Sequence, residues 1–148
     1  MSTTTPKAAK HAQLPPLASR FVDVERLPWE KSRYPGIETK TLLFDRASGV
    51  ATMLMKMAPG AKLPDHEHVR IEQTYVLEGS LVCGEGECKK GEFVWRPAGS
   101  RHEAWGGPQG GVMLAIFQIP NRFHQPDGRE TDFLGNDWKK AWGHALRG

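Results

Sequence analysis

The stretch GAKLPDHEHVRIEQTYVLEG, residues 60–79, carries two histidines and a glutamate at even spacings between two glycines. Four of its polar residues share one parity: His66, His68, Arg70 and Glu72. On an extended strand, residues of one parity point their side chains to the same side. Burying such groups costs free energy unless a partner satisfies them, and a metal ion can do so. The pattern predicts a metal site, with a solvated strand edge as the alternative.

A second stretch, GEFVWRPAGSRHEAWG at residues 91–106, adds a histidine behind a glycine, a proline and another glycine. Together the two stretches resemble the paired signatures of the cupin superfamily. The first signature is present in full: Gly60, five residues, His66, one residue, His68, three residues, Glu72, six residues and Gly79. The second is present in four positions: Gly91, Pro97, Gly99 and His102. It departs at Gly106, where the family often has asparagine.

The resemblance covers about residues 36–120 and implies an all-β fold, a cupin jelly-roll β-barrel. It also implies one divalent metal held by four side chains: His66, His68, Glu72 and His102. Imidazole and carboxylate ligands suit iron, zinc or manganese better than calcium or magnesium. In an octahedral shell, four protein ligands leave two positions for water, oxygen or a bidentate substrate, whereas a closed tetrahedral zinc site leaves none.

The chain resembles two different subgroups of the cupins. The phrases KTLLFDRASG, PGAKLPDHEHVRIEQTYVLEGSL and FVWRPAGSRHEAW look like the cupin domain of ChrR-type anti-sigma factors, which binds zinc. The chain is also similar in size to small acetylacetone-cleaving and hydroxyacetophenone-cleaving cupin dioxygenases, which use three histidines on iron without the glutamate. Glu72 therefore favours the ChrR-like group. Sigma-factor binding is disfavoured, because few residues precede the barrel and they contain no cysteine.

Short segments between frequent turn signals predict the strands of the barrel. They are residues 37–44, 50–57, 71–77, 80–83, 92–96, 102–105 and 112–119. The predicted turns are at residues 46–49, 78–79, 84–86, 90–91, 97–99 and 106–111. No segment from residue 37 to residue 119 shows a sustained helical period.

Seven residues are candidates for the wall of a substrate pocket: Met53, Met55, Arg70, Phe93, Trp95, Met113 and Phe117. The apolar ones have core packing as the alternative role, since methionine fills irregular gaps in cores. Arg70 shares the parity of the ligands and is a candidate for holding an anionic substrate, with a surface salt bridge as the alternative.

The two ends of the chain differ in composition from the middle. Residues 1–20 predict a disordered tail, residues 21–120 the cupin domain, and residues 121–148 an extension that packs on the barrel or on a partner subunit. Within this extension, Asp137 is a candidate helix cap. Trp138, Trp142 and Leu146 would then form one apolar stripe.

The remaining composition excludes several classes of protein. A net charge of +3, with scattered basic residues, argues against nucleic-acid binding. The absence of a long apolar run argues against a membrane protein, and without a signal peptide we expect a cytoplasmic location. Cys83 and Cys88 would then be reduced thiols on either side of a hairpin turn, with a redox pair as the alternative.

The leading hypothesis is a metal-dependent dioxygenase that acts on a small dicarbonyl or an aromatic ketone, with no catalytic residue beyond the metal site. Two histidines and a carboxylate are the set associated with non-heme iron and oxygen chemistry. The second hypothesis is a non-catalytic zinc-binding sensor of small molecules. The third is a metal-dependent isomerase or lyase. By analogy with the family, we expect a homodimer.

Overall fold

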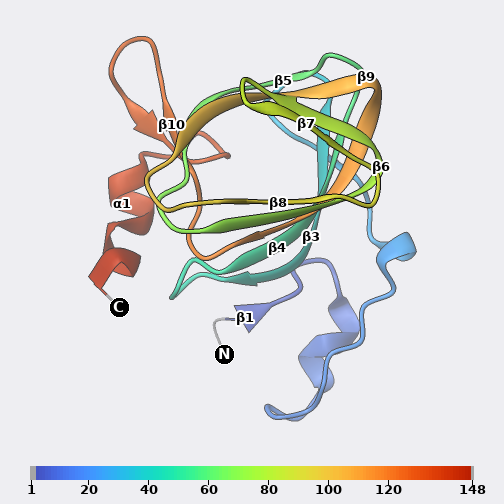
Figure 1. The fold of residues 1–148 in the computed structure, drawn as a ribbon. Helices are drawn as coiled ribbons and strands as arrows, with labels where there is room; N and C mark the ends of the chain where they lie inside the picture. Colours follow the sequence, from blue (N-terminus) through green and yellow to red (C-terminus); the bar gives the residue numbers. More distant parts are fainter. Residues whose placement is uncertain (1–2, 148) are drawn as a thin grey trace.

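The computed structural model describes residues 3–147 and has an all-β fold with one short helix near the C-terminus (Figure 1). The barrel strands are β3 (Ile37–Asp45), β4 (Ala51–Met57), β5 (Lys62–Glu67), β6 (Glu72–Cys83), β7 (Gly86–Lys89), β8 (Phe93–Arg96), β9 (Arg101–Phe117), β10 (Arg122–His124) and β11 (Glu130–Thr131). Outside them lie β1 (Thr3–Thr4), β2 (Glu30–Lys31), 3₁₀ turns at Ala9–Gln13, Val24–Arg26 and Gly143–Arg147, and α1 (Trp138–Trp142).

Two long strands, β6 and β9, hold the barrel together, and all strand pairs in it are antiparallel. The later half of β9 pairs with β4 on one side and with the first half of β6 on the other. Its first half pairs with β5 and with the end of β6. Each long strand therefore takes part in both walls of the barrel, which confirms the predicted jelly-roll type of fold (Figure 1).

Two of the predicted turns are wrong. Residues 78–79 lie inside β6 and residues 106–111 lie inside β9. The strands predicted on either side of each turn are therefore one continuous strand. The ladder between β6 and β9 shifts register on both sides of Gly79, where the chain bulges with φ of +62°. A Cβ atom at Gly79 would overlap the carbonyl oxygen of Gly110. These glycines therefore serve close approach of two backbones at a bulge rather than chain reversal.

Other sequence-based predictions are confirmed. The turn at residues 46–49 joins β3 to β4, and the amide of Asp45 donates to the carbonyl of Val50 at 2.8 Å. The turn at residues 84–86 joins β6 to β7. No helix lies between residues 37 and 119, all of which the structure describes.

The two cysteines are free and partly buried. Cys83 is the cross-strand partner of Gly86, and Cys88 is the partner of Leu81. The two thiols are therefore offset along the hairpin rather than directly opposed across it.

The C-terminal helix lies against the barrel (Figure 1). The carboxylate of Asp137 caps it by accepting from the amide of Lys140 at 2.9 Å. Trp138 and Trp142 are buried and pack with Val69 and Ile119 in one apolar cluster. Leu146, the third residue of the predicted stripe, is 38% exposed.

The N-terminal residues lie outside the barrel (Figure 1). β1 pairs with the end of β3, and the ammonium group of Lys40 donates to the carbonyl of Val24 at 2.8 Å. Residues 3–20 thus include a short strand and a 3₁₀ turn. No helix in the described part of the chain is long and apolar enough to cross a membrane.

Candidate metal centre

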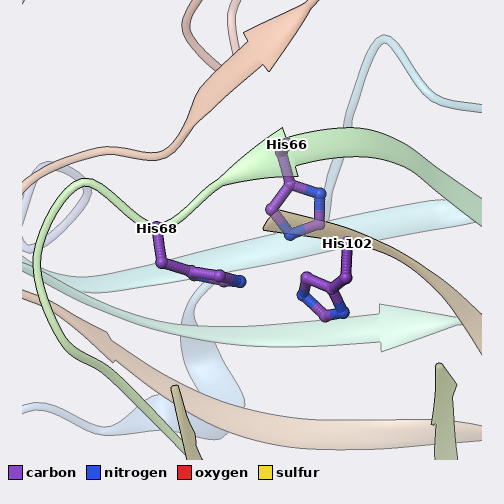
Figure 2. Close-up of side chains that lie close together, drawn as sticks. All are labelled: His66, His68 and His102. Carbon is purple, nitrogen blue, oxygen red and sulfur yellow. The ribbon is translucent and has the colours of Figure 1, made fainter. Parts of the chain in front are cut away.

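Three histidines, two of them buried and one partly buried, lie close together (Figure 2). His66 lies near the end of β5 and is the cross-strand partner of His102, near the start of β9. His68 follows β5, where its amide donates to the carbonyl of Ser100 at 2.8 Å. The amide of Gly99 in turn donates to the carbonyl of His68 at 2.7 Å. Backbone pairing therefore joins the two sequence signatures.

The side chains of these histidines point toward one another (Figure 2). One nitrogen from each ring lies within 4.8 Å of the others. The ring centroids are 4.7 Å apart for His66 and His102, 4.9 Å for His68 and His102, and 5.0 Å for His66 and His68. Three nitrogens at this spacing are close enough to share one ion.

The protonation of two of these rings suits metal binding. Burial lowers the pKa of His66 to about 4, against the opposing effect of its hydrogen bond to Pro64. Burial also lowers the pKa of His102 to about 3. Both rings are therefore neutral near pH 7. In His66 the Nδ1 atom lies 2.7 Å from the carbonyl of Pro64, so Nδ1 carries the proton and Nε2 keeps its lone pair.

Several buried ring nitrogens have no hydrogen-bond partner among the described residues. In this cluster they are both nitrogens of His68 and Nδ1 of His102, and outside the cluster Nδ1 of His11 is another. Leaving a buried polar atom unpaired costs about 1–3 kcal/mol. Three such atoms, gathered with His66 in one place, fit a site whose missing partner is a transition-metal ion.

Glu72, at the start of β6, lies beside this cluster. Its carboxylate accepts hydrogen bonds from Thr74 and Asn121, each at 3.1 Å. One of its oxygens is also 3.1 Å from Nδ1 of His68, although the ring is not aligned for a hydrogen bond. Burial raises the pKa of this carboxyl, but its contacts with His68 and Asn121 and the nearby charge outweigh that effect and lower the pKa to about 2. Glu72 is therefore an anion next to the three histidines.

A cavity of about 430 Å³ adjoins the cluster. Four of the predicted pocket residues line it: Met53, Met55, Met113 and Phe117. His66, His102 and Glu72 line it as well. A cavity wall that is mostly apolar and carries some polar groups is typical of a site for a small organic molecule.

The other three predicted pocket residues lie elsewhere. Phe93 and Trp95 are 53% and 57% exposed and line a second pocket, of about 450 Å³, that also reaches Arg96 and His102. Arg70 is exposed and lines neither pocket. The reason is a bend at residues 69–70, between β5 and β6, which ends the single-strand parity assumed in the sequence and buries Val69 instead.

Four residues of the site were not predicted from the sequence. Thr74 follows Glu72 at strand spacing, so the parity of β6 could have indicated it. Arg96 precedes the signature proline, and its burial follows only from the pairing of β8 with β6. Pro64 and Asn121 lie far apart along the chain, and no sequence signal marks either one.

Solved structures with this fold include enzymes and a regulator. A candidate acetylacetone dioxygenase from Methylibium petroleiphilum PM1 matches with a TM-score of 0.70 and 20% identity, over 89% of this chain and 97% of that one. An acetylacetone dioxygenase from Acinetobacter johnsonii matches with a TM-score of 0.68 and 17% identity, over 88% and 93%. The complex of SigE with the anti-sigma ChrR from Rhodobacter sphaeroides matches with a TM-score of 0.54 and 20% identity, over 64% and 50%.

At these identities the matches establish the fold alone. None of the curated protein sequences compared with this chain matches it. The model of one protein family, described as the ChrR cupin-like domain, matches residues 18–122. This span includes the three histidines and Glu72. The chain therefore belongs to the ChrR cupin-like domain family.

Proposed function

We propose that this protein is a metal-dependent dioxygenase that cleaves a carbon–carbon bond in a small dicarbonyl compound or an aromatic ketone. The observation that carries the proposal is the group of three histidines, two of which, His66 and His102, line a largely apolar cavity. The similarity in fold to two proteins described as acetylacetone dioxygenases supports the same class of reaction.

The residues proposed to hold the metal are His66, His68 and His102, with Glu72 as the fourth ligand. A divalent transition metal bound there supplies Lewis-acid polarisation of a chelating substrate and redox chemistry toward dioxygen. Iron, manganese and zinc all suit this donor set.

The protein's own groups hold and shield the site. The Pro64 carbonyl fixes the tautomer and orientation of the His66 ring. Thr74 and Asn121 fix the carboxylate of Glu72 from two sides. Met55, Met113 and other apolar side chains of the cavity exclude water and leave room for a small apolar molecule.

A zinc-binding sensor without catalytic activity is the second candidate. Two observations favour it, namely the match to the ChrR cupin-like family and the carboxylate of Glu72 beside the histidines. A metal-dependent isomerase or lyase is a weaker third candidate, which would turn over substrate without oxygen.

Metal analysis and an oxygen electrode distinguish these candidates. The protein is purified without a histidine tag, its metal content is measured, and it is reconstituted with Fe(II) and screened against β-diketones and hydroxyacetophenones. Oxygen uptake that is lost in His66→Asn and kept in His144→Asn, a change at an exposed histidine, supports the dioxygenase. Tightly held zinc without turnover supports the sensor, and anaerobic turnover supports the isomerase or lyase.

We also propose that the protein is a homodimer. Four large apolar side chains are exposed on neighbouring strands β6 and β8: Tyr75, Leu77, Phe93 and Trp95. Tyr75 and Phe93 are direct cross-strand partners. An exposed apolar face of this kind is typical of a surface that contacts another protein.

A further inference from the structure

Arg96 is a buried cation with weak partners. Its side chain is 9% exposed. One guanidinium nitrogen lies 3.7 Å from the thiol sulfur of Cys83, which is a poor acceptor. Another lies 3.6 Å from a carboxylate oxygen of Glu85, whose own side chain is 84% exposed. A buried charge normally has a close, well-directed partner, and Arg96 has none among the described residues.

The position of Arg96 places its charge at the metal site. It ends β8 as the cross-strand partner of Glu72, and it lines the same cavity as His66 and His102.

The charges that face the cavity do not balance once a metal is present. The cavity is lined by four cationic side chains, Lys7, Lys31, Arg46 and Arg96, and by three anionic ones, Glu30, Glu72 and Asp132. Glu72 is the anion in contact with the histidines. The imidazoles are neutral ligands, so a divalent ion would leave an excess of positive charge in a largely apolar space. An anionic ligand would remove that excess, and its charge would be strongly favoured at low dielectric.

We propose that Arg96 binds a carboxylate group of the substrate, so that the substrate class is a small oxo acid rather than a neutral diketone. This inference rests on the proposed function and narrows it. The guanidinium has two parallel N–H donors that match a carboxylate. The oxo oxygens would then face the histidines, and the hydrocarbon part would lie against the methionines of the cavity.

A matched pair of ligands tests this directly. In 2,4-dioxopentanoate a carboxylate replaces one terminal methyl group of 2,4-pentanedione. Titration calorimetry measures the affinity of each for the zinc-loaded protein, in which no oxygen chemistry occurs. We expect the carboxylate to bind at least about tenfold more tightly, as hydrogen bonds to a charged group allow. Arg96→Met should remove this preference, and Arg70→Met, at the exposed arginine, should keep it.

Several outcomes would overturn the inference. These are equal binding of the two ligands, tighter binding of the neutral one, no binding of the carboxylate, or a preference that survives in Arg96→Met. If Arg96→Met does not fold, the affinities of the two ligands are compared for the wild-type protein and for Arg96→Lys instead. Calorimetry does not depend on turnover, so the two proposals can fail separately. Tighter binding of the carboxylate without oxygen uptake would contradict the dioxygenase but would still support carboxylate binding by Arg96.

Discussion

His66 and His102 lie directly opposite each other in the ladder between β5 and β9, with ring centroids 4.7 Å apart. Backbone pairing brings two of the three imidazoles together, and the Pro64 carbonyl orients one of them. The site is therefore largely formed before any metal binds, and metal binding should stabilise the folded protein without reorganising it.

Removing one of these imidazoles should weaken metal binding severely. We expect His66→Asn to lower zinc affinity by more than the roughly 10- to 100-fold typical of losing an outer-shell partner. It should also abolish the rise in melting temperature on adding zinc. Competition with a chromophoric chelator measures the affinity. His144→Asn is the control, and equal affinity in the two variants would refute the site.

Glu72 should behave as a ligand. Glu72→Gln is then expected to lower metal affinity as much as His66→Asn does. Asn121→Ala removes only one hydrogen bond to that carboxylate, so its loss should stay within the roughly 10- to 100-fold range of outer-shell changes. The competition with a chromophoric chelator measures both affinities. If Glu72→Gln loses no more metal affinity than Asn121→Ala, the carboxylate contacts His68 and is not itself a metal ligand.

The metal-free protein should lose stability in mild acid. Burial holds the pKa of His66 at about 4 and that of His102 at about 3, below the value of about 6.5 expected in the unfolded chain. Between pH 6.5 and 4 the unfolded chain therefore binds more protons, and the free energy of unfolding falls as pH falls. Each histidine contributes up to about 1.4 kcal/mol per pH unit.

Urea denaturation in the presence of a chelator, repeated across this pH range, measures that slope. His102→Asn removes one of the two groups and should flatten it. An unchanged slope in the variant would show that protonation of this ring is not linked to folding.

The exposed face of β6 and β8 should mediate self-association. Light scattering during size-exclusion chromatography is expected to give the mass of a dimer. Trp95→Lys places a charge at a side chain that is 57% exposed, and should shift the mass toward the monomer. Phe21→Lys, at a residue that is 89% exposed outside the barrel, should not. A monomeric wild-type protein would contradict the homodimer.

The spacing of short strands and turn signals predicted a β-sandwich or β-barrel, and the resemblance to the two cupin signatures predicted the histidine cluster. In the structure, the pairing of β5 with β9 brings His66 opposite His102, and the backbone of His68 pairs with that of Ser100 and Gly99. The parity argument failed at Arg70 because it assumed one continuous strand, whereas residues 69–70 bend. Arg96 was not predicted because its burial depends on long-range pairing and not on local pattern.

The two glycines of the first signature also differ in a way that depends on long-range pairing and not on local sequence pattern. Gly60 and Gly79 both have positive φ, of +71° and +62°, so an alanine at either position would incur about 1–2 kcal/mol of backbone strain. From the sequence alone, alanine at either glycine would be expected to have the same effect. In the structure, a Cβ at Gly79 would overlap the Gly110 carbonyl, whereas a Cβ at Gly60 would meet nothing within 4 Å.

Gly79→Ala should therefore destabilise the protein more than Gly60→Ala does. The overlap with β9 would add a cost of about 1–3 kcal/mol, because the two central strands of the barrel would have to move apart. Urea denaturation of both variants gives the difference, with Gly60→Ala as the control for strain alone. Equal losses of unfolding free energy would mean that β6 and β9 do not approach each other closely at this bulge.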